Sequence, residues 1–294
     1  MTSGGTAGLV VVDKEAGWTS HDVVARCRRI FGQRRVGHAG TLDPDATGVL
    51  LVGLGRATRL LRFLTPLPKT YTGEIVLGSA TTTLDAAGET TGTWAMDGIT
   101  LEEVQAAARG LTGDILQVPP MVSAVKVQGR RLHQLARQGI EVERAARPVT
   151  VRRFDVGSGS GPGRFAFEVE CSSGTYVRSL ADDLGRALGG GAHLGSLRRT
   201  GIGSFGTDDA RAVDALGPAD VVSPAEALRH LDRIPVDAEV EALVRRGLAL
   251  DRVPLGMAGP GPWAVVDGAG DLLAVYEGTE TDRVRPVVVL AGGG

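Results

Sequence analysis

The stretch GHAGTLDPDATGVLLVGLGRATRLL, from Gly37 to Leu61, places an aspartate between a leucine and a proline, shortly before a strongly apolar run. Aspartate and proline both favour turns for local backbone reasons, so Asp43 and Pro44 predict a loop. The apolar residues from Val49 to Leu54 predict a buried strand after that loop. Asp43 is therefore either an ordinary turn residue or a working chemical group.

The segments on either side of this loop alternate between strand and helix patterns. Residues 8–14 are typical of a buried strand, and Thr19 with Asp22 forms a capping box that predicts a helix start. Residues 69–78 and 164–171 show the alternation of half-buried strands. Hairpins interleaved with helices, without a solenoid repeat, predict an α+β fold: a mixed, largely antiparallel sheet flanked by helices.

The composition changes after Phe205. Acidic helical stretches there lead to three short strand patterns, WAVVDG, LLAVYEG and RPVVVLAG, separated by glycine turns. We therefore predict two domains: a large one over residues 1–230 and a small β-rich C-terminal one over residues 231–294.

Charge is distributed unevenly along the chain, although the formal net charge is only −2. Arg26 to Lys69 holds nine basic residues and two acidic ones, a balance of +7, and Lys126 to Arg153 holds eight and two, a balance of +6. Gly73 to Val125 between them has seven acidic residues against Arg109 alone. Each basic block alone could be a solvated surface. Two such blocks together favour a nucleic-acid partner.

Several other classes of protein are disfavoured by the sequence. Two cysteines, Cys27 and Cys171, give neither a disulfide framework nor a metal cluster, and the five histidines lack metal-ligand spacing. GLGRAT lacks the full dinucleotide fingerprint, and no serine sits in a GxSxG elbow. The start has no basic leader, and no segment approaches the roughly 20 apolar residues that span a bilayer. We therefore expect a soluble, cytoplasmic protein without a metal.

A resemblance to a known family rests on several motifs together. DKEAGWTSHDVV precedes the Asp43 loop, KTY follows it, and PPMVSAVKVQGRRLHQLARQG, SSGTYVRSLADDLG and HLGSLRRTGIGSF come later in the family's order and spacing. Over about residues 8–205 the chain resembles the TruB family of tRNA pseudouridine synthases, which implies the pseudouridine synthase fold. The C-terminal part resembles that family's small PUA-like RNA-binding domain only loosely.

The resemblance implies that the protein converts uridine 55 in the T loop of tRNA to pseudouridine, with neither cofactor nor metal. By match to the family motifs, Asp43 is the catalytic aspartate, Tyr71 stacks on the target base, and Arg178 supports catalysis. Three further matches line the uridine pocket or hold the flipped nucleotide: His38, Tyr176 and Leu197. Ala80 and Thr82 depart from the Arg and Asp usual in the loop after the KxY strand, although Asp85 remains.

The chemistry explains these residue types independently of the family name. The reaction breaks the N1–C1′ bond, turns the uracil and joins C5 to C1′, for which one ionised carboxylate is the minimum. Asp43 could attack C1′ or remove a C2′ proton, and the sequence leaves both routes open. A guanidinium from Arg178 would favour the carboxylate anion. Each partner residue also has an ordinary alternative: Arg178 on a helix surface, and Tyr71 and Leu197 in the core.

The basic blocks would hold the RNA backbone while the uridine is extruded, a step that costs a few kcal/mol. We place a basic RNA-gripping hairpin at about residues 122–153. The residues expected to bind the RNA backbone are Lys14, Arg34, Arg35, Lys69, Lys126, Arg130 and Arg131. The expected partner is the T arm of tRNA, bound by a monomer.

Two other function classes stay open beside the isomerase. One is an RNA-binding or RNA-folding module in which catalysis matters little, and the set of Asp43, Tyr71 and Arg178 argues against it. The other is a small-molecule enzyme with an acidic nucleophile, which the basic blocks disfavour. A glycoside hydrolase would need a second carboxylate, and Asp45, two residues away in the same turn, is poorly placed for that role.

Overall fold

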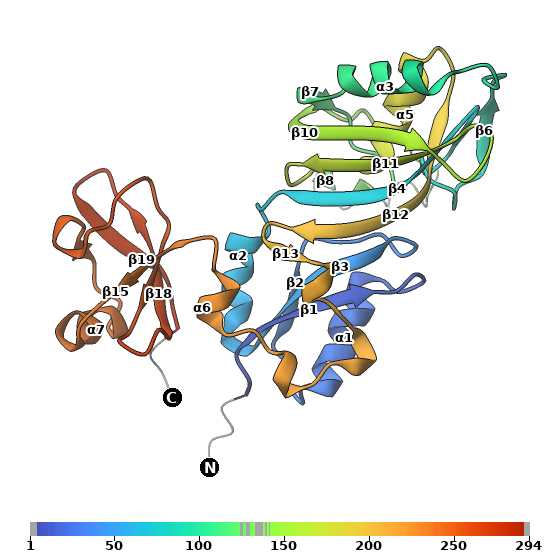
Figure 1. Cartoon of the computed structure of the whole chain (residues 1–294). Helices are drawn as coiled ribbons and strands as arrows, with labels where there is room; N and C mark the ends of the chain where they lie inside the picture. The colour runs from blue at the N-terminus through green and yellow to red at the C-terminus, as the bar shows by residue number, and fades with distance from the viewer. Residues whose placement is uncertain are drawn as a thin grey trace. The chain divides into compact units, whose positions relative to one another are not determined.

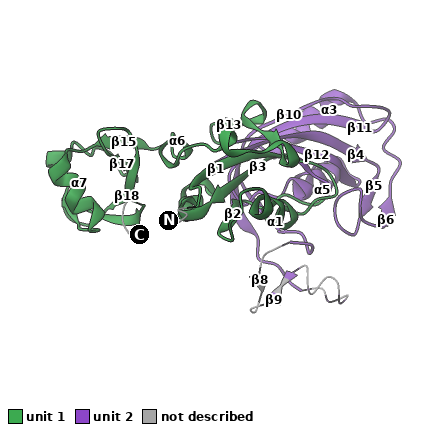
Figure 2. Ribbon diagram, turned by 90° about the horizontal axis from the view of Figure 1, so that it is seen from below, with its two compact units in different colours: residues 1–44, 48–66, 203–294 green, residues 45–47, 67–202 purple. Residues whose placement is uncertain are grey.

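The computed structural model describes residues 5–123, 126–127, 130–132, 138, 140 and 142–290, and the chain forms two compact units. Unit 1 consists of residues 1–44, 48–66 and 203–294, and unit 2 of residues 45–47 and 67–202 (Figure 2). Each unit thus joins segments that are distant in sequence. Both combine helices with sheets, which confirms the predicted α+β class (Figure 1).

The first part of unit 1 is a small mixed sheet covered by one helix. Strand β3 pairs antiparallel with both β1 and β2, and β14 pairs parallel with β1. The strands are β1 (Gly8–Lys14), β2 (Val36–Ala39), β3 (Thr47–Leu54) and β14 (Arg211–Ala212). The helical elements near them are α1 (Ser20–Ile30), η1 (Gly55–Leu60) and α2 (Leu61–Leu64).

Helix α1 forms where the sequence predicts it. Both halves of the capping box between Thr19 and Asp22 are present and satisfy amide groups at its start. Val23, Val24 and Cys27 lie on one face and pack against strand residues of β1 and β3. Burial raises the pKa of the Cys27 thiol to about 11, so this cysteine is an inert core residue.

The last part of unit 1 holds a separate five-stranded sheet in the order β15-β17-β18-β19-β16. Its elements are β15 (Asp232–Pro235), α7 (Ala238–Arg245), β16 (Leu250–Asp251), η5 (Val253–Leu255), β17 (Trp263–Val266), β18 (Leu272–Gly278) and β19 (Arg283–Val289). Trp263 and Tyr276 are the largest side chains in its core. The three predicted C-terminal strand patterns all form strands here. The domain boundary near residue 230 stays a prediction.

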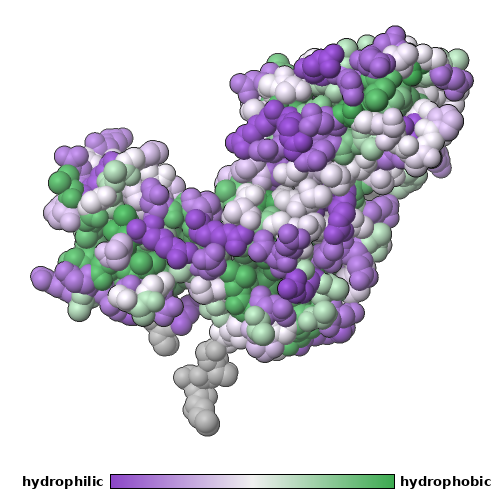
Figure 3. All heavy atoms as spheres, viewed as in Figure 1, coloured by the Kyte–Doolittle hydropathy of each residue, from purple (hydrophilic) through white to green (hydrophobic). Residues whose placement is uncertain are grey.

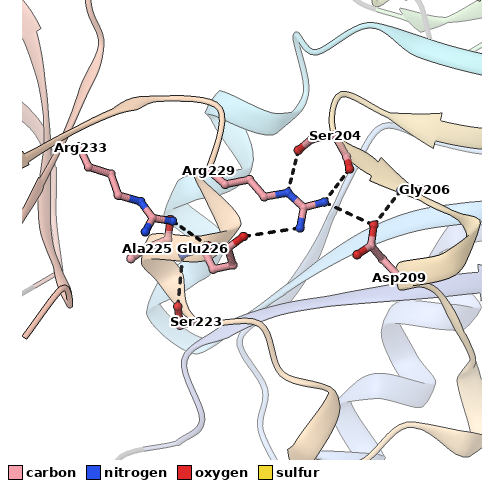
Figure 4. Close-up of polar contacts among 8 residues, drawn as sticks. All are labelled: Ser204, Gly206, Asp209, Ser223, Ala225, Glu226, Arg229 and Arg233. Atoms are coloured by element: carbon pink, nitrogen blue, oxygen red, sulfur yellow. Dashed lines mark hydrogen bonds and ion pairs between the residues drawn. The ribbon is translucent and has the colours of Figure 1, made fainter.

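Arg229 organises the segment that leads into this C-terminal sheet, after η2 (Thr207–Asp209) and α6 (Pro224–Ala227) (Figure 4). Its guanidinium lies over the Phe205 ring at 4.1 Å and donates to Ser204 Oγ at 2.8 Å. The same group lies 3.3 Å from Asp209 and 3.6 Å from Glu226. One arginine therefore ties α6 to the chain before η2. The short elements between them are η3 (Val213–Ala215) and η4 (Pro218–Asp220).

Unit 2 is built on an antiparallel sheet in the order β12-β4-β11-β10-β7. Its strands are β4 (Lys69–Leu77), β7 (Gly113–Gln117), β10 (Arg147–Ser158), β11 (Arg164–Cys171) and β12 (Ala192–Ile202). Helix α3 (Leu101–Gly110) packs on β10, and α5 (Val177–Ala187) packs on β12. Two short pairs complete the unit: β5 (Ser79–Thr81) with β6 (Thr90–Thr93), and β8 (Lys126–Val127) with β9 (Arg130–Arg131).

The alternation of β11 separates the two faces of this sheet. Phe165, Phe167, Val169 and Cys171 are buried, whereas the residues between them are partly or fully exposed. Cys171 is a buried core thiol, as its strand pattern predicts, and burial raises its pKa to about 11. None of the helices among the described residues is long and apolar enough to cross a membrane.

Candidate active site

Asp43 lies in a loop of unit 1. The residue before it, Leu42, is held by the start of α1. Ser20 Oγ donates to Leu42 O at 3.1 Å and accepts from Leu42 N at 2.9 Å. Leu42 is buried, and Asp43 is half-buried. Gly40 turns the chain into this loop at φ +85°, a conformation that favours glycine. The carboxylate therefore stands on a rigid backbone.

The residue after Asp43 is fixed as well, by the end of β1. Lys14 Nζ donates to Pro44 O at 2.8 Å, and Gly17 N donates to the same oxygen at 3.0 Å. Lys14 is only 1% exposed and also donates to the carbonyls of Trp18 and Glu15. A lysine buried among carbonyl oxygens cannot reach an RNA phosphate, so its predicted backbone-binding role is corrected to one of supporting the Asp43 loop.

His38, which the family match places at the uridine pocket, lies on β2 of unit 1 and is half-buried. Its ring meets the ring of His21 edge to face, with centroids 5.5 Å apart. His21 is on the first turn of α1, next to the Ser20 that holds Leu42. The same end of α1 thus supports both the aspartate loop and His38.

Tyr71 lies on β4 of unit 2, opposite Val169 of β11 and Arg199 of β12. It is 7% exposed. Lys69, two residues earlier, is 5% exposed, and its ammonium donates to Leu67 O at 2.7 Å. Burial, and then the positive charge of Arg199, lower the pKa of Lys69 to about 8. Lys69 is therefore a core residue, which corrects its prediction as a surface contact for phosphate.

Arg178 is a buried residue of α5 whose guanidinium is held by three groups of unit 2. Nη1 donates to Thr83 O at 2.9 Å, and Nη2 donates to Val122 O at 3.0 Å. Nη1 also lies 3.5 Å from Asp85 Oδ2. The alternative of a surface arginine is wrong, because the side chain is only 6% exposed. The loop in which Ala80 and Thr82 depart from the family pattern thus still supplies an acidic partner, Asp85, to Arg178.

The start of α5 is docked by residues that no sequence motif singles out. Gln117 Oε1 accepts from Tyr176 N at 2.7 Å, and Gln117 Nε2 donates to Tyr176 O at 3.1 Å. Ser179 Oγ donates to Val118 O at 3.1 Å. These bonds place the half-buried Tyr176 and Arg178 at the same end of α5. A glutamine at the end of a short strand carries no sequence signal for this role.

Unit 2 has a cavity of about 820 Å³ beside its sheet. Its lining includes Leu197 of β12, which lies opposite Gly73 of β4 and is half-buried. Tyr71 and Arg178 do not line it. Four carboxylate residues do: Asp45, Glu74, Asp155 and Glu168. Of the predicted site residues only Leu197 lines this cavity. Three of its four carboxylates are paired with arginines: Glu74 with Arg164, and Asp155 and Glu168 with Arg153.

The predicted backbone-binding arginines differ in their surroundings. Arg34, Arg35 and Arg130 are exposed, and Arg130 donates to Gln138 Oε1. The side chains of the other two predicted hairpin residues, Lys126 and Arg131, lie outside the described part of the structure. The short β8–β9 pair lies within the range of about 122–153 predicted for the hairpin, and the RNA-gripping role of that range stays a prediction. Among the described residues, no group of three or more His, Cys, Asp or Glu could hold a metal ion.

Together these contacts fix the position of a polar group in each unit that could take part in a reaction. Unit 1 offers a carboxylate, Asp43, on a loop that is anchored on both sides. Unit 2 offers a guanidinium, Arg178, whose direction is set by two carbonyl oxygens. A carboxylate can act as nucleophile or base, and a guanidinium stabilises negative charge.

Comparison with known proteins identifies the family. Residues 28–177 match the model of the TruB family pseudouridylate synthase N-terminal domain, and residues 178–241 match that of the tRNA pseudouridylate synthase B C-terminal domain. The tRNA pseudouridine synthase B of Rhodococcus jostii is 50% identical, over 92% of this chain and 90% of that protein. The protein of the same name from Mycobacteroides abscessus is 48% identical, over 97% of this chain and 96% of its own.

A solved structure also shares the fold. A chain in the crystal structure of a Cbf5-Nop10-Gar1 complex superposes with a TM-score of 0.73 at 26% identity, covering 96% of this chain and 83% of that chain. This likeness extends over nearly the whole chain. The chain belongs to the TruB family of pseudouridylate synthases, an isomerase family.

Proposed function

We propose that this protein converts uridine 55 in the T loop of tRNA to pseudouridine, using Asp43 and no cofactor. The family assignment and the names of the curated relatives support tRNA as the substrate. The observation on which the proposal chiefly rests is the anchoring of the Asp43 loop, through Leu42 on one side and Pro44 on the other. Catalytic groups need such a fixed backbone.

Asp43 acts at the sugar of the target nucleotide. As a nucleophile it would bond to C1′ while the N1–C1′ bond breaks, and C5 would then displace it once the uracil has turned. As a base it would take the C2′ proton while the N1–C1′ bond breaks, which leaves a glycal and a uracil anion; C5 would then bond to C1′ as a proton returns to C2′. In both routes C5 finally loses its proton and N1 gains one. Both routes need an ionised carboxylate, and neither includes a redox step or a metal ion.

Arg178 and Tyr71 serve the same reaction from unit 2. We assign Arg178 to catalysis on the family match, and Asp85 with the Thr83 and Val122 carbonyls fixes the direction of its guanidinium. Tyr71 offers a ring for stacking on the flipped base. Tyr176, His38 and Leu197 hold the nucleotide, as the family match implies.

The substrate must be bound tightly enough to offset the cost of flipping the uridine. Exposed basic side chains supply this binding through the phosphates, and Lys14 and Lys69 are excluded from them by burial. Arg34, Arg35 and Arg130 are exposed, and Lys126 and Arg131 stay predicted contacts whose side chains lie outside the described part of the structure. We further propose that the protein acts on tRNA as a monomer in the cytoplasm.

One assay separates this proposal from the two other function classes. Purified protein is added to an unmodified tRNA transcript tritiated at uridine C5, without cofactor, and label release is followed. The proposal expects release of one label per tRNA. A matched transcript with cytidine at position 55, labelled at its remaining uridines, should release none. An RNA-folding module or a small-molecule enzyme would release label from neither transcript.

A further inference from the structure

Four exposed arginines gather where α1 ends and the chain turns into β2. Arg28 Nε donates to Arg34 O at 3.1 Å, and its Nη2 donates to Val36 O at 3.3 Å. These bonds hold the end of the helix to the start of the strand. We call Arg28, Arg29, Arg34 and Arg35 the arginine corner; all four are exposed.

Contacts within the fold account for only some of the arginines in this corner. Arg28 and Arg29 lie in the last turn of α1, where positive charge favours the helix dipole. Arg35 Nε donates to Thr58 Oγ1 at 2.9 Å. The side chains of Arg29 and Arg34 make no hydrogen bond or ion pair with any described residue. Two guanidinium groups thus have neither a hydrogen-bond nor an ion-pair partner among the described residues.

No acidic residue of the described chain neutralises the corner. Residues 23–42 contain five arginines and neither aspartate nor glutamate, and of these five only Arg26 forms an ion pair within the described structure, with Asp214. Like charges repel one another when they are held close together. The corner is therefore a surface whose counterion must come from outside the described chain.

Arginines on strand β10, unlike those of the arginine corner, form ion pairs with acidic residues. On β10, Arg152 pairs with Glu170, and Arg153 pairs with both Asp155 and Glu168. Figure 3 shows a strongly hydrophilic area over one end of β10 and β11. That surface is neutralised by its own strands, so it has little charge to offer a polyanion.

We propose that Arg28 and Arg29 join Arg34 and Arg35, which the proposed function already gives as phosphate contacts, and that the whole arginine corner binds the sugar–phosphate backbone of the RNA substrate; this inference rests on the proposed function. Guanidinium groups suit phosphate oxygens because they donate two parallel hydrogen bonds. A protein partner fits less well, because protein interfaces have an apolar core. None of the large hydrophobic side chains exposed on the described surface lies within residues 23–42.

The position of the corner determines which part of the RNA it contacts. Helix α1 begins at Ser20, which is bonded to Leu42 beside Asp43, and Arg28 comes eight residues later. At 1.5 Å per residue the corner is about 12 Å along the helix from the Asp43 loop. It therefore contacts backbone flanking the target nucleotide and contributes affinity, while the reacting atoms are handled elsewhere.

The test compares two double variants of equal charge change. Arg29→Gln with Arg34→Gln removes the two arginines that lack partners in the described fold, and Arg152→Gln with Arg153→Gln removes two that are paired. Binding of an unmodified tRNA transcript is titrated between about 50 and 200 mM salt, with every protein in an Asp43→Asn background so that turnover plays no part. Removing one side chain that neutralises a phosphate should shrink the ratio of Kd at the two salt concentrations roughly threefold.

The corner variant should therefore show a Kd ratio roughly tenfold smaller than its parent, with weaker binding at low salt. The Arg152 and Arg153 variant should stay close to the parent. Equal salt dependence in the corner variant and its parent would overturn the proposal, and so would an equal change in both variants. Failure of the tritium assay would count against the proposed function alone, since the binding titration needs no chemistry.

Discussion

Arg178 Nη1 lies 3.5 Å from Asp85 Oδ2, and both side chains are largely buried within unit 2. The same aspartate accepts from the Thr83 hydroxyl and from Ala87 N through its other oxygen, Oδ1. Asp85 is therefore fixed by its own loop and in turn orients the guanidinium. In the proposed mechanism it is a positioning residue for Arg178.

Replacing Asp85 with Asn should keep the shape of this loop and remove the charge that orients Arg178. We expect kcat on tRNA to fall about tenfold, equivalent to about 1.4 kcal/mol of barrier, with little change in Kd. Asp97→Asn, an exposed acidic residue of the same unit, is the matched control. A larger effect on Kd than on kcat would show that Asp85 acts in binding.

Replacing Lys14 with Met should loosen the Asp43 loop. Three carbonyl oxygens lose a charged donor, and Pro44 O keeps only the bond from Gly17 N. We expect the free energy of unfolding to fall by about 3 kcal/mol. We also expect kcat to fall when it is measured well below the melting temperature, where the variant is still folded. Thermal unfolding and label release measure the two effects, with the exposed Glu15→Gln as control. A destabilised variant with unchanged kcat would limit Lys14 to a structural role.

The buried Lys69 should make stability depend on pH in the alkaline range. Its pKa is lowered from 10.5 to about 8 by burial and by Arg199. Between these values the unfolded state binds more protons than the folded state, so stability rises with pH over this window. Relative to Lys69→Met, the wild type should gain at most about 3 kcal/mol between pH 8 and 10.5. Parallel stability curves for the two proteins would refute a lowered pKa.

Tyr71 should act through its ring and its hydroxyl separately. Phe keeps the stacking surface and should slow the reaction through loss of the hydroxyl, whereas Ala should also lose about 1–3 kcal/mol of stacking. Because Tyr71 is buried, rates are compared well below the melting temperature of each variant. Equal rates for the two variants would mean that the ring is not a stacking platform.

Local patterns predicted much of the fold. Strands β1 and β11 match their predicted bounds, and the capping box at Thr19 forms, because these signals depend on neighbouring residues alone. Strand β12 carries no such signal. Its sequence AHLGSLRRTGI lacks alternation, and its pairing with β4 contains two register shifts. Partners from elsewhere in the chain, which the sequence does not reveal, define that strand.

The same limit applies to the charges. The sequence indicates where basic residues lie along the chain, but not which of them are neutralised or buried. Arg153 belongs to a predicted basic block and is paired with Asp155 and Glu168, and Lys14 is enclosed by carbonyl oxygens. Arg29 and Arg34 stay exposed without partners among the described residues. Only the fold distinguishes these cases.

The most direct test of the account is label release by Asp43→Asn, since the whole mechanism depends on one carboxylate. The amide keeps the shape of the side chain but can act neither as nucleophile nor as base, so we expect turnover to be lost and tRNA affinity to stay nearly unchanged. Asp45→Asn, two residues away in the same loop, should retain turnover. Steady tritium release by a contamination-free Asp43→Asn preparation would contradict the central claim.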